Sequence, residues 1–308
     1  MTLQQLRYIV AIEQYGHFGK AAEACDSTQP TLSLMVRKLE EELDVRIFDR
    51  DSHPVVPTEI GRKVIERAKM VLYGAGQISE MTRSEKESLS GPLRVALIST
   101  VAPVLVPGLF KFIGQNYPAI GLQTEEMITE TIKDKLHKAE VDIGILTSPV
   151  NDPELLEIPL YTEKFFAYVS EDDPAYPEES ISSEALFSRP VWIMKSGLKL
   201  FDFSRIGEDE MITYEGFFEG GRVGTLIQIV NDNGGMTVIP ETHIGLILYS
   251  LQKGIRPIVN PEPRRTIAIA IRRDYIHEAM LNAVVKAVRQ IIPAGMQESV
   301  IRRDYIRL

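Results

Sequence analysis

The chain has little cysteine and no long run of apolar residues. Its 308 residues include a single cysteine, Cys25, which excludes an internal disulfide, a cysteine-ligated metal cluster and a two-thiol redox switch. No apolar run reaches the roughly 18 residues that a membrane span needs, and the first residues lack the basic start and apolar core of a secretory signal. These absences favour a cytoplasmic protein in a reducing compartment, without a membrane partner.

The sequence also lacks the motifs of known catalytic sites. It contains no Ser-His-Asp order and no glycine-rich phosphate loop, and its histidines do not show zinc-ligand spacing. We therefore expect no enzymatic activity, no cofactor and no metal site. His243 and His277 are isolated, which favours packing roles for both. The five histidines are His17, His53, His137, His243 and His277.

The net charge is an argument against a nucleic-acid partner. The chain has 34 Lys and Arg residues against 43 Asp and Glu residues, a net charge of −9. Phosphate binding requires a basic footprint. A DNA-binding prediction must therefore rest on local motifs.

The first ninety residues are predicted to be helical. Thr2 and Gln5 form a capping box for the first helix, and a short helix is expected at 18–24. Thr28 is a good N-cap, and Pro30 stands in the first turn of a longer helix that ends near Leu43. The apolar stripe of that helix comprises Leu32, Val36, Leu39 and Leu43. Short helix, turn and longer helix are the arrangement of a helix-turn-helix.

A wing and a long helix are expected next. Apolar segments at 45–50 and 55–56 flank a turn and predict two short strands, the wing of a winged helix-turn-helix. Thr58 then caps a helix that runs to about residue 87. Its near-heptad spacing predicts dimerisation, and packing on its own domain is the alternative. The apolar positions of this helix are Ile60, Val64, Ala68, Val71, Ala75 and Ile78.

The start of the helix at 28–43 carries side chains that suit double-stranded DNA. In this motif the second helix enters the major groove, where Gln29 can pair with adenine and Thr31 can contact a thymine methyl. Arg37 and Lys38 suit phosphate or guanine. The candidate DNA-binding residues are Thr28, Gln29, Pro30, Thr31, Ser33, Leu34, Arg37, Lys38, Arg50 and His53. Residues 1–57 carry a net charge of −3, so a helical protein-interaction module is the alternative.

The rest of the chain alternates strands and helices, as in a parallel α/β sheet. A crossover near 161–169 and a return through 255–259 and 267–271 predict two lobes. Strands expected at 191–194, 211–214 and 236–239, with a helix at 222–231, form the second lobe. The expected fold is an all-α winged helix-turn-helix domain followed by an α/β two-lobed, periplasmic-binding-protein-like domain. The expected parts are 1–57 for DNA binding, 58–90 for dimerisation and 91–308 for effector binding.

Three hydroxyl groups are candidates for effector binding. Ser99 and Thr100 follow a predicted strand and precede a helix, and Thr129 opens the next helix. Ligands in such sheets bind beside helix N-termini at the carboxyl ends of strands. The alternative is that these hydroxyl groups only cap their helices.

Residues 3–65 resemble the N-terminal domain of LysR-type transcriptional regulators. The matching segments are 6–8, 16–22, 27–33, 37–43, 46–50 and 58–61. The order of the domains and the total length fit that family as well. The resemblance implies a homodimer or homotetramer that binds double-stranded DNA, responds to a small-molecule effector and acts on RNA polymerase.

The second part resembles the peroxide-sensing members of that family. The matching residues are Thr100, Thr129, Gly197, Leu200, Asp202 and the segment 234–240. In those members a histidine and two cysteines carry the chemistry, and the positions are occupied here by Leu198, Lys199 and Glu208. No thiolate can form there, so peroxide chemistry is not expected.

Leu198 and Lys199 nevertheless remain effector-site candidates. Lys199 is either a solvated loop lysine or a positive charge for an anionic effector. Cys25 is expected to be a packing residue. The competing interpretation of the whole chain is a small-molecule-binding protein with a helical interaction module at its N-terminus. The segment 271–276 recurs at 301–306, and the role of the second copy is left open.

Overall fold

The computed structural model describes residues 1–50, 52–81, 89–187, 191–194, 217–218, 222–275 and 277–299. The chain divides into two compact units, which we treat separately. The N-terminal unit is Met1–Ser88 with Asp134–Val141, and the C-terminal unit is Leu89–Lys133 with Asp142–Leu308. Of the helices within the described ranges, none combines the length and the apolar character needed to cross a membrane.

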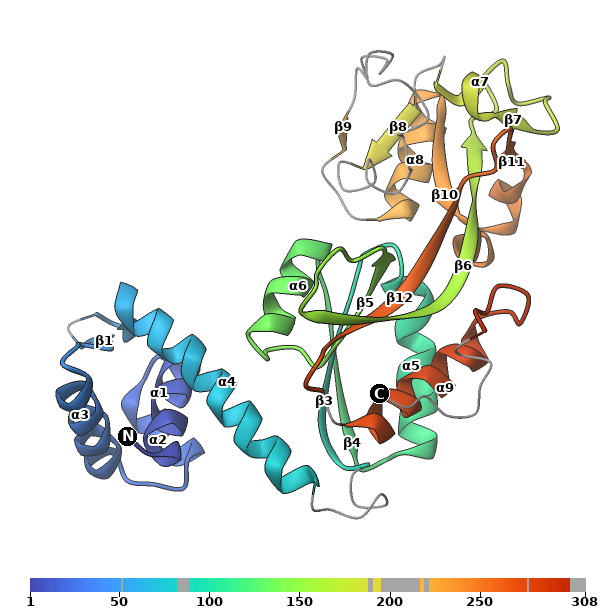
Figure 1. Ribbon diagram of the computed structural model, residues 1–308. Coiled ribbons are helices and arrows are strands. Elements are labelled where there is room, and N and C mark those ends of the chain that lie inside the picture. The colour runs from blue at the N-terminus through green and yellow to red at the C-terminus, as the bar shows by residue number, and fades with distance from the viewer. Residues whose placement is uncertain are drawn as a thin grey trace. The chain divides into compact units, whose positions relative to one another are not determined.

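The N-terminal unit begins with three helices and a two-stranded wing (Figure 1). The elements are α1 (Leu3–Tyr15), α2 (Phe18–Ala24), α3 (Gln29–Leu43), β1 (Phe48–Asp49), β2 (Val56–Pro57) and α4 (Glu59–Met81). The predicted capping box of Thr2 and Gln5 is confirmed, as is Thr28 as the N-cap of α3. His17 caps α2 by accepting hydrogen bonds from the backbone N–H groups of Gly19 and Lys20, a role that the sequence did not predict.

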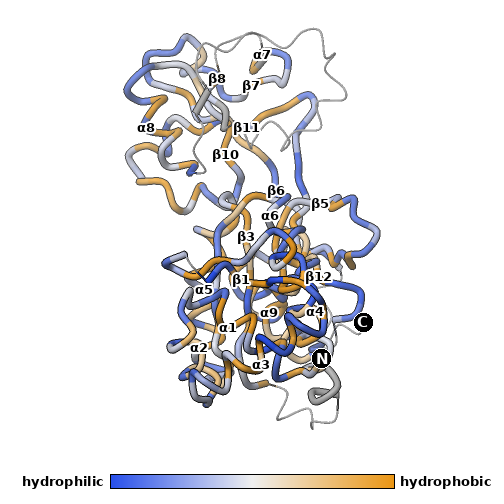
Figure 2. Tube along the Cα trace, turned by 90° about the vertical axis from the view of Figure 1, so that its left-hand side faces the viewer, coloured by the Kyte–Doolittle hydropathy of each residue, from blue (hydrophilic) through white to orange (hydrophobic). Residues whose placement is uncertain are grey.

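The core of this unit lies between α1, α2, α3 and the start of α4. Leu32, Val36 and Leu39 are fully buried against residues of α1 such as Ile9, as the predicted stripe requires. Leu43 was expected to complete the stripe, but it is exposed because the helix ends there and Asp44 takes a left-handed conformation. Figure 2 shows hydrophobic and hydrophilic stretches alternating along these helices, which is typical of amphipathic packing.

The wing corrects one part of the predicted fold class. β1 pairs antiparallel with β2, with Phe48 opposite Pro57. The N-terminal unit is therefore not all-α, because a small sheet completes it. The pairing is only two residues long, and Pro57 has no N–H to donate to it.

Only part of the apolar stripe predicted for the long helix α4 is exposed to solvent. Ala68 is buried in the core of the N-terminal unit, and Val64 packs partly against the same core. Ile60 and Val71 are 45% and 47% exposed. Part of the stripe therefore packs on its own unit, which was the alternative to dimerisation, and the rest is exposed.

The first lobe of the C-terminal unit is built on a mixed sheet. Its strands are β3 (Gly91–Leu97), β4 (Ile120–Glu126), β5 (Ile143–Ser148), β6 (Leu155–Val169) and β12 (Arg264–Arg272), in the order β4-β3-β5-β12-β6. β3 is parallel to β4 and β5, but β12 is antiparallel to β5 and β6. The predicted parallel sheet is therefore correct for three strands only, because β12 returns from the second lobe in the opposite direction.

Helices cover this sheet. They are α5 (Ala102–Asn116), α9 (Glu278–Ile291) and the first residues of α6 (Thr129–His137), whose residues from Asp134 on belong to the N-terminal unit. α5 and α9 lie side by side in Figure 1, and the side chain of Ile291 packs closely over Gly108. A Cβ on Gly108 would lie 2.5 Å from Ile291, so a glycine permits this close approach.

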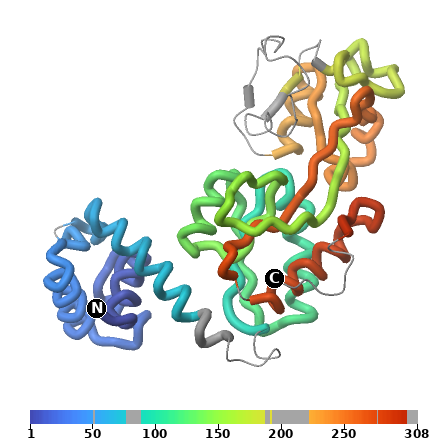
Figure 3. Tube along the Cα trace, in the orientation of Figure 1, coloured from blue at the N-terminus to red at the C-terminus, as the bar shows by residue number. Residues whose placement is uncertain are grey.

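The second lobe is joined to the first by two strands. β6 is 15 residues long; its first part pairs with β12 and its last part with β10, and Figure 3 shows β6 and β12 running side by side between the lobes. The other elements are β7 (Ile181–Ser182), α7 (Ser183–Phe187), β8 (Val191–Met194), β9 (Phe217–Phe218), α8 (Val223–Asn233), β10 (Met236–Pro240), η4 (Glu241–Leu246), η5 (Tyr249–Gly254) and β11 (Ile255–Val259). The strand predicted at 211–214 and the second copy of the repeated segment lie outside the described residues. The likeness to periplasmic binding proteins stays a prediction.

Candidate nucleic-acid interface and effector cavity

The predicted DNA-binding residues of α3 lie on the surface. Ser33 is half-buried, and the side of the helix that carries Leu32, Val36 and Leu39 faces the core. The exposed members of the set are Thr28, Gln29, Pro30, Thr31, Leu34, Arg37 and Lys38. The leading tip of α3 is therefore accessible to a large partner.

The tip is organised by short hydrogen bonds and by close packing of α2. The hydroxyl groups of Thr28 and Thr31 are 2.8 Å apart, so one donates to the other. A Cβ on Gly19 would lie 3.0 Å from the ring of His17 and 3.5 Å from Oε1 of Gln29. The start of α2 thus lies against the start of α3, and the lack of a side chain at Gly19 leaves room for Gln29.

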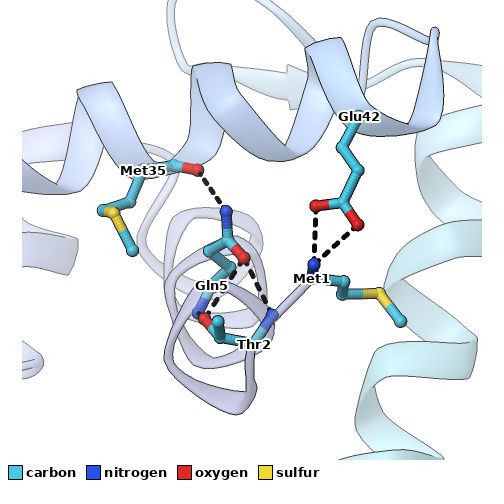
Figure 4. A network of polar contacts seen from close by, with 5 residues as sticks. All are labelled: Met1, Thr2, Gln5, Met35 and Glu42. Atoms are coloured by element: carbon cyan, nitrogen blue, oxygen red, sulfur yellow. Dashed lines mark hydrogen bonds and ion pairs between the residues drawn. The ribbon is translucent and has the colours of Figure 1, made fainter.

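The N-terminal residues fix α3 onto α1 (Figure 4). Gln5 is buried, and its Nε2 donates a hydrogen bond of 3.1 Å to the carbonyl oxygen of Met35. The N-terminal ammonium group of Met1 donates to both carboxylate oxygens of Glu42, at 2.7 and 2.6 Å. The sequence predicted Gln5 as a capping residue but did not predict this second bond, since a bond across 30 residues leaves no local signal.

Glu40 fastens the wing to the end of α3. Its Oε1 accepts hydrogen bonds from the backbone N–H groups of Ile47 and Phe48, at 2.8 and 3.3 Å. Its Oε2 accepts one of 2.8 Å from Arg50, whose guanidinium also lies 5.4 Å above the ring of Phe18. Arg50, a predicted wing contact, is therefore held beside a carboxylate, whereas His53 is exposed.

Two of the predicted effector residues, Ser99 and Thr100, do not cap the helix that follows them. The N-cap of α5 is Val101, and no side chain caps that helix, so Ser99 and Thr100 do not have the capping role that was the alternative. Thr100 is buried, and its Oγ1 accepts a hydrogen bond of 2.8 Å from Arg265. Thr129 is half-buried at the start of α6, and Leu198 and Lys199 lie outside the described residues.

A buried ionic cluster lies where the two lobes join. The side chains of Arg265 and Glu163 are 1% and 0% exposed, and Nη2 of Arg265 is 2.7 Å from Oε1 of Glu163. The other oxygen of Glu163 accepts hydrogen bonds from the backbone N–H and the hydroxyl group of Thr242, at 3.2 and 2.6 Å. This cluster was not predicted, because its members are about a hundred residues apart in the sequence.

His243 adjoins this cluster. Burial, and to a lesser extent the charge of Arg265, lower the pKa of His243 to about 4, so the imidazole is neutral at pH 7. Its Nδ1 is buried without a hydrogen-bond partner. The sequence suggested a packing role for this histidine, and its burial is in agreement with that.

A cavity of about 800 Å³ opens between the lobes of the C-terminal unit. Apolar side chains of α5, of α8 and of the segment 246–251 form much of its wall, and its polar groups include Glu125, Glu126, Arg222 and His243. Of the residues predicted to bind an effector, Ser99, Thr100 and Thr129 are not among the described residues that line it. Among the described residues, the cavity can therefore hold a small molecule through side chains other than those of Ser99, Thr100 and Thr129.

Cys25 packs partly against the core of the N-terminal unit. Burial raises the pKa of its thiol above the ordinary value. A raised pKa disfavours the thiolate, so the environment agrees with the packing role predicted for this residue.

Comparison with known proteins relates both units to one family. Residues 3–62 match the bacterial regulatory helix-turn-helix protein, lysR family, and residues 86–292 match the LysR substrate binding domain. A hydrogen peroxide-inducible genes activator of Haemophilus influenzae is 30% identical over 303 residues, 95% of this chain and 99% of that protein. The DNA-binding transcriptional dual regulator OxyR of Escherichia coli is 29% identical over 296 residues, 94% of this chain and 95% of its own. A structure of a full-length OxyR variant from Pseudomonas aeruginosa superposes with a TM-score of 0.80 at 33% identity, covering 97% of this chain and 98% of the other.

Proposed function

The chain belongs to the lysR family of bacterial regulatory helix-turn-helix proteins, and on this basis we propose that α3 reads duplex DNA while the C-terminal unit senses a small effector. It is a DNA-binding transcriptional regulator and not an enzyme. The proposal for α3 rests on the polar and basic character of its exposed face. From residue 28 to residue 38 that segment contains no acidic residue, its leading tip is exposed, and Arg37 and Lys38 stand on the solvent side.

The proposed contacts follow the chemistry of the groove. Gln29 and Ser33 suit hydrogen bonds to base edges, and Arg37 and Lys38 suit phosphate or guanine. His53 of the wing suits the backbone or the minor groove. Arg50 contributes less than the sequence suggested, because Glu40 neutralises part of its charge.

A pair of matched variants tests this proposal. Footprinting with the full chain on the DNA upstream of its own gene should reveal a protected site, which would then serve as the probe for titrations in rising salt. Lys38→Gln should weaken binding and reduce the salt slope by about 1 for each N-terminal unit bound, because one phosphate contact is lost. Lys63→Gln makes the same charge change on the exposed side of α4 and should leave both values unchanged.

The outcome separates two classes of protein. A site that is protected and that responds to Lys38→Gln supports a DNA-binding regulator. Absence of any sequence preference at low salt would favour the other reading, a small-molecule-binding protein whose helical N-terminus serves protein contact.

We propose that the chain acts as a homodimer or homotetramer that presents two or more α3 helices together, with RNA polymerase as its further partner at promoters. The exposed apolar residues Ile60, Met70 and Val71 of α4 support pairing through that helix. Linked binding raises affinity without any new contact. Sedimentation of the full chain at micromolar concentration tests the assembly, and a chain that stays single would contradict it.

The effector is proposed to bind in the cavity between the lobes and not to be peroxide acting on a thiol pair. Lys199 and Glu208 occupy the positions where the peroxide-sensing relatives are expected to carry cysteine, and Cys25 is the only cysteine of the chain. Hydrogen peroxide should therefore leave DNA binding unchanged. Calorimetry with a panel of small organic acids, on the wild type and on Lys199→Ala, tests whether that lysine attracts an anion; equal affinities would show that it is a solvated loop residue.

A further inference from the structure

The outward face of α3 carries an apolar side chain at its centre. Leu34 is 54% exposed, although leucine is a residue that usually avoids water. Helix geometry gives about 100° of rotation per residue, which places Leu34 about 190° around the helix from the middle of the buried stripe of Leu32, Val36 and Leu39. It therefore points almost directly away from the core of its own unit.

The neighbours of Leu34 on this face are polar or basic. Thr31 precedes it by three residues, and Arg37 and Lys38 follow it by three and four, so all of them share its side of the helix. A leucine can neither donate nor accept a hydrogen bond. Placed against the polar edge of a base, it would leave that edge without a partner and would cost affinity.

Among the groups that bases present in the major groove, the methyl group of thymine is the one that suits such a side chain. Resting on the proposed function of α3, we propose that Leu34 reads the methyl group on C5 of a thymine. Thr31 also carries a methyl group, but Leu34 presents the larger apolar side chain at the centre of the exposed face. Leu34 thereby sets one base of the recognition sequence by apolar contact alone.

The test removes the methyl group from the DNA and leaves everything else in place. Duplexes that the full chain selects from a random library are the probe, and each thymidine is replaced in turn by deoxyuridine. Within a half-site, one of these single replacements should weaken wild-type binding about fourfold, since burial of one methyl-sized group contributes about 0.8 kcal/mol and each 1.4 kcal/mol is tenfold. With Leu34→Ala the same substitution should have no effect.

Leu43→Ala is the matched control. Leu43 is also an exposed leucine of α3, but it lies at the far end of the helix, so this variant should keep the fourfold sensitivity of the wild type. Selected duplexes whose binding is indifferent to every uridine substitution would overturn the assignment to Leu34, and so would an undiminished sensitivity in Leu34→Ala. In either case sequence-specific binding, and with it the proposed function, would stand. A library from which no duplex is enriched would instead overturn both.

Discussion

Loss of the arginine at the junction of the lobes should strongly destabilise the C-terminal unit. Arg265→Met keeps most of the length of the side chain but leaves Glu163 charged and wholly enclosed by protein. Breaking one partner of a buried ion pair costs about 3–5 kcal/mol, because the remaining charge is uncompensated. The loss of the hydrogen bond to Thr100 adds to this cost.

A double-mutant cycle measures the pair itself. Glu163→Gln removes the charge that Arg265→Met would strand, so the double variant should recover about 2–3 kcal/mol relative to the sum of the single changes. Arg264→Met is the control, since that neighbouring arginine pairs with Glu262 at the surface and should cost less than about 1 kcal/mol.

The single tryptophan provides the assay for this cycle. Trp192 lies in the second lobe, where its Nε1 donates a hydrogen bond of 3.0 Å to the carbonyl oxygen of Gly234. Urea unfolding followed by its fluorescence therefore reports on the C-terminal unit. Strict additivity of the two single variants, or an equal cost for Arg264→Met, would refute the account of the cluster.

Two further predictions concern stability. Burial lowers the pKa of His243 to about 4 in the folded protein, whereas the unfolded chain protonates it near pH 6.5. The free energy of unfolding of the wild type should therefore fall by up to about 3 kcal/mol as the pH falls from 6.5 to 4. Urea unfolding of His243→Gln should lack this loss. Gly61→Ala would place a Cβ 2.0 Å from the backbone oxygen of Ile47 and should destabilise the N-terminal unit by about 1–3 kcal/mol. Gly74→Ala on the same helix meets open space and should stabilise the unit by about 0.5–1 kcal/mol. Unfolding followed by circular dichroism measures both changes. Equal effects of the two glycine variants would contradict the close contact of α4 with the wing.

The helices could be predicted closely wherever their signals are local. The short helix expected at 18–24 forms as α2, and α3 begins where Thr28 and Pro30 indicate. Caps, periodic apolar positions and prolines in the first turn lie within a few residues of one another, so the sequence carries them directly. The first wing strand is shorter than the segment expected at 45–50, and the second lies one residue later than expected.

What the sequence could not indicate depends on contacts between distant segments. The direction of β12 is decided by the path of the chain through the second lobe, so the sheet is mixed although each strand alone suits a parallel sheet. The same limit applies to the hydrogen bond that Thr100 accepts from Arg265, because the two residues are 165 positions apart. The exposure of the tip of α3 could be predicted without contacts between distant segments. A helix whose apolar stripe packs on the core must expose its opposite side.

The acidity of the N-terminal part and a DNA-facing role are compatible because two of its carboxylates are paired with positive charges of the same unit. Glu40 holds the wing and pairs with Arg50, and Glu42 binds the N-terminal ammonium, a positive charge that a count of lysine and arginine omits. Both carboxylates come after Lys38, in the part of α3 beyond the proposed groove contacts. A surface with so few cations gains little from phosphate alone, so each copy depends on base contacts and on a second copy bound beside it. Low net charge thus favours discrimination between sequences over general attraction to DNA.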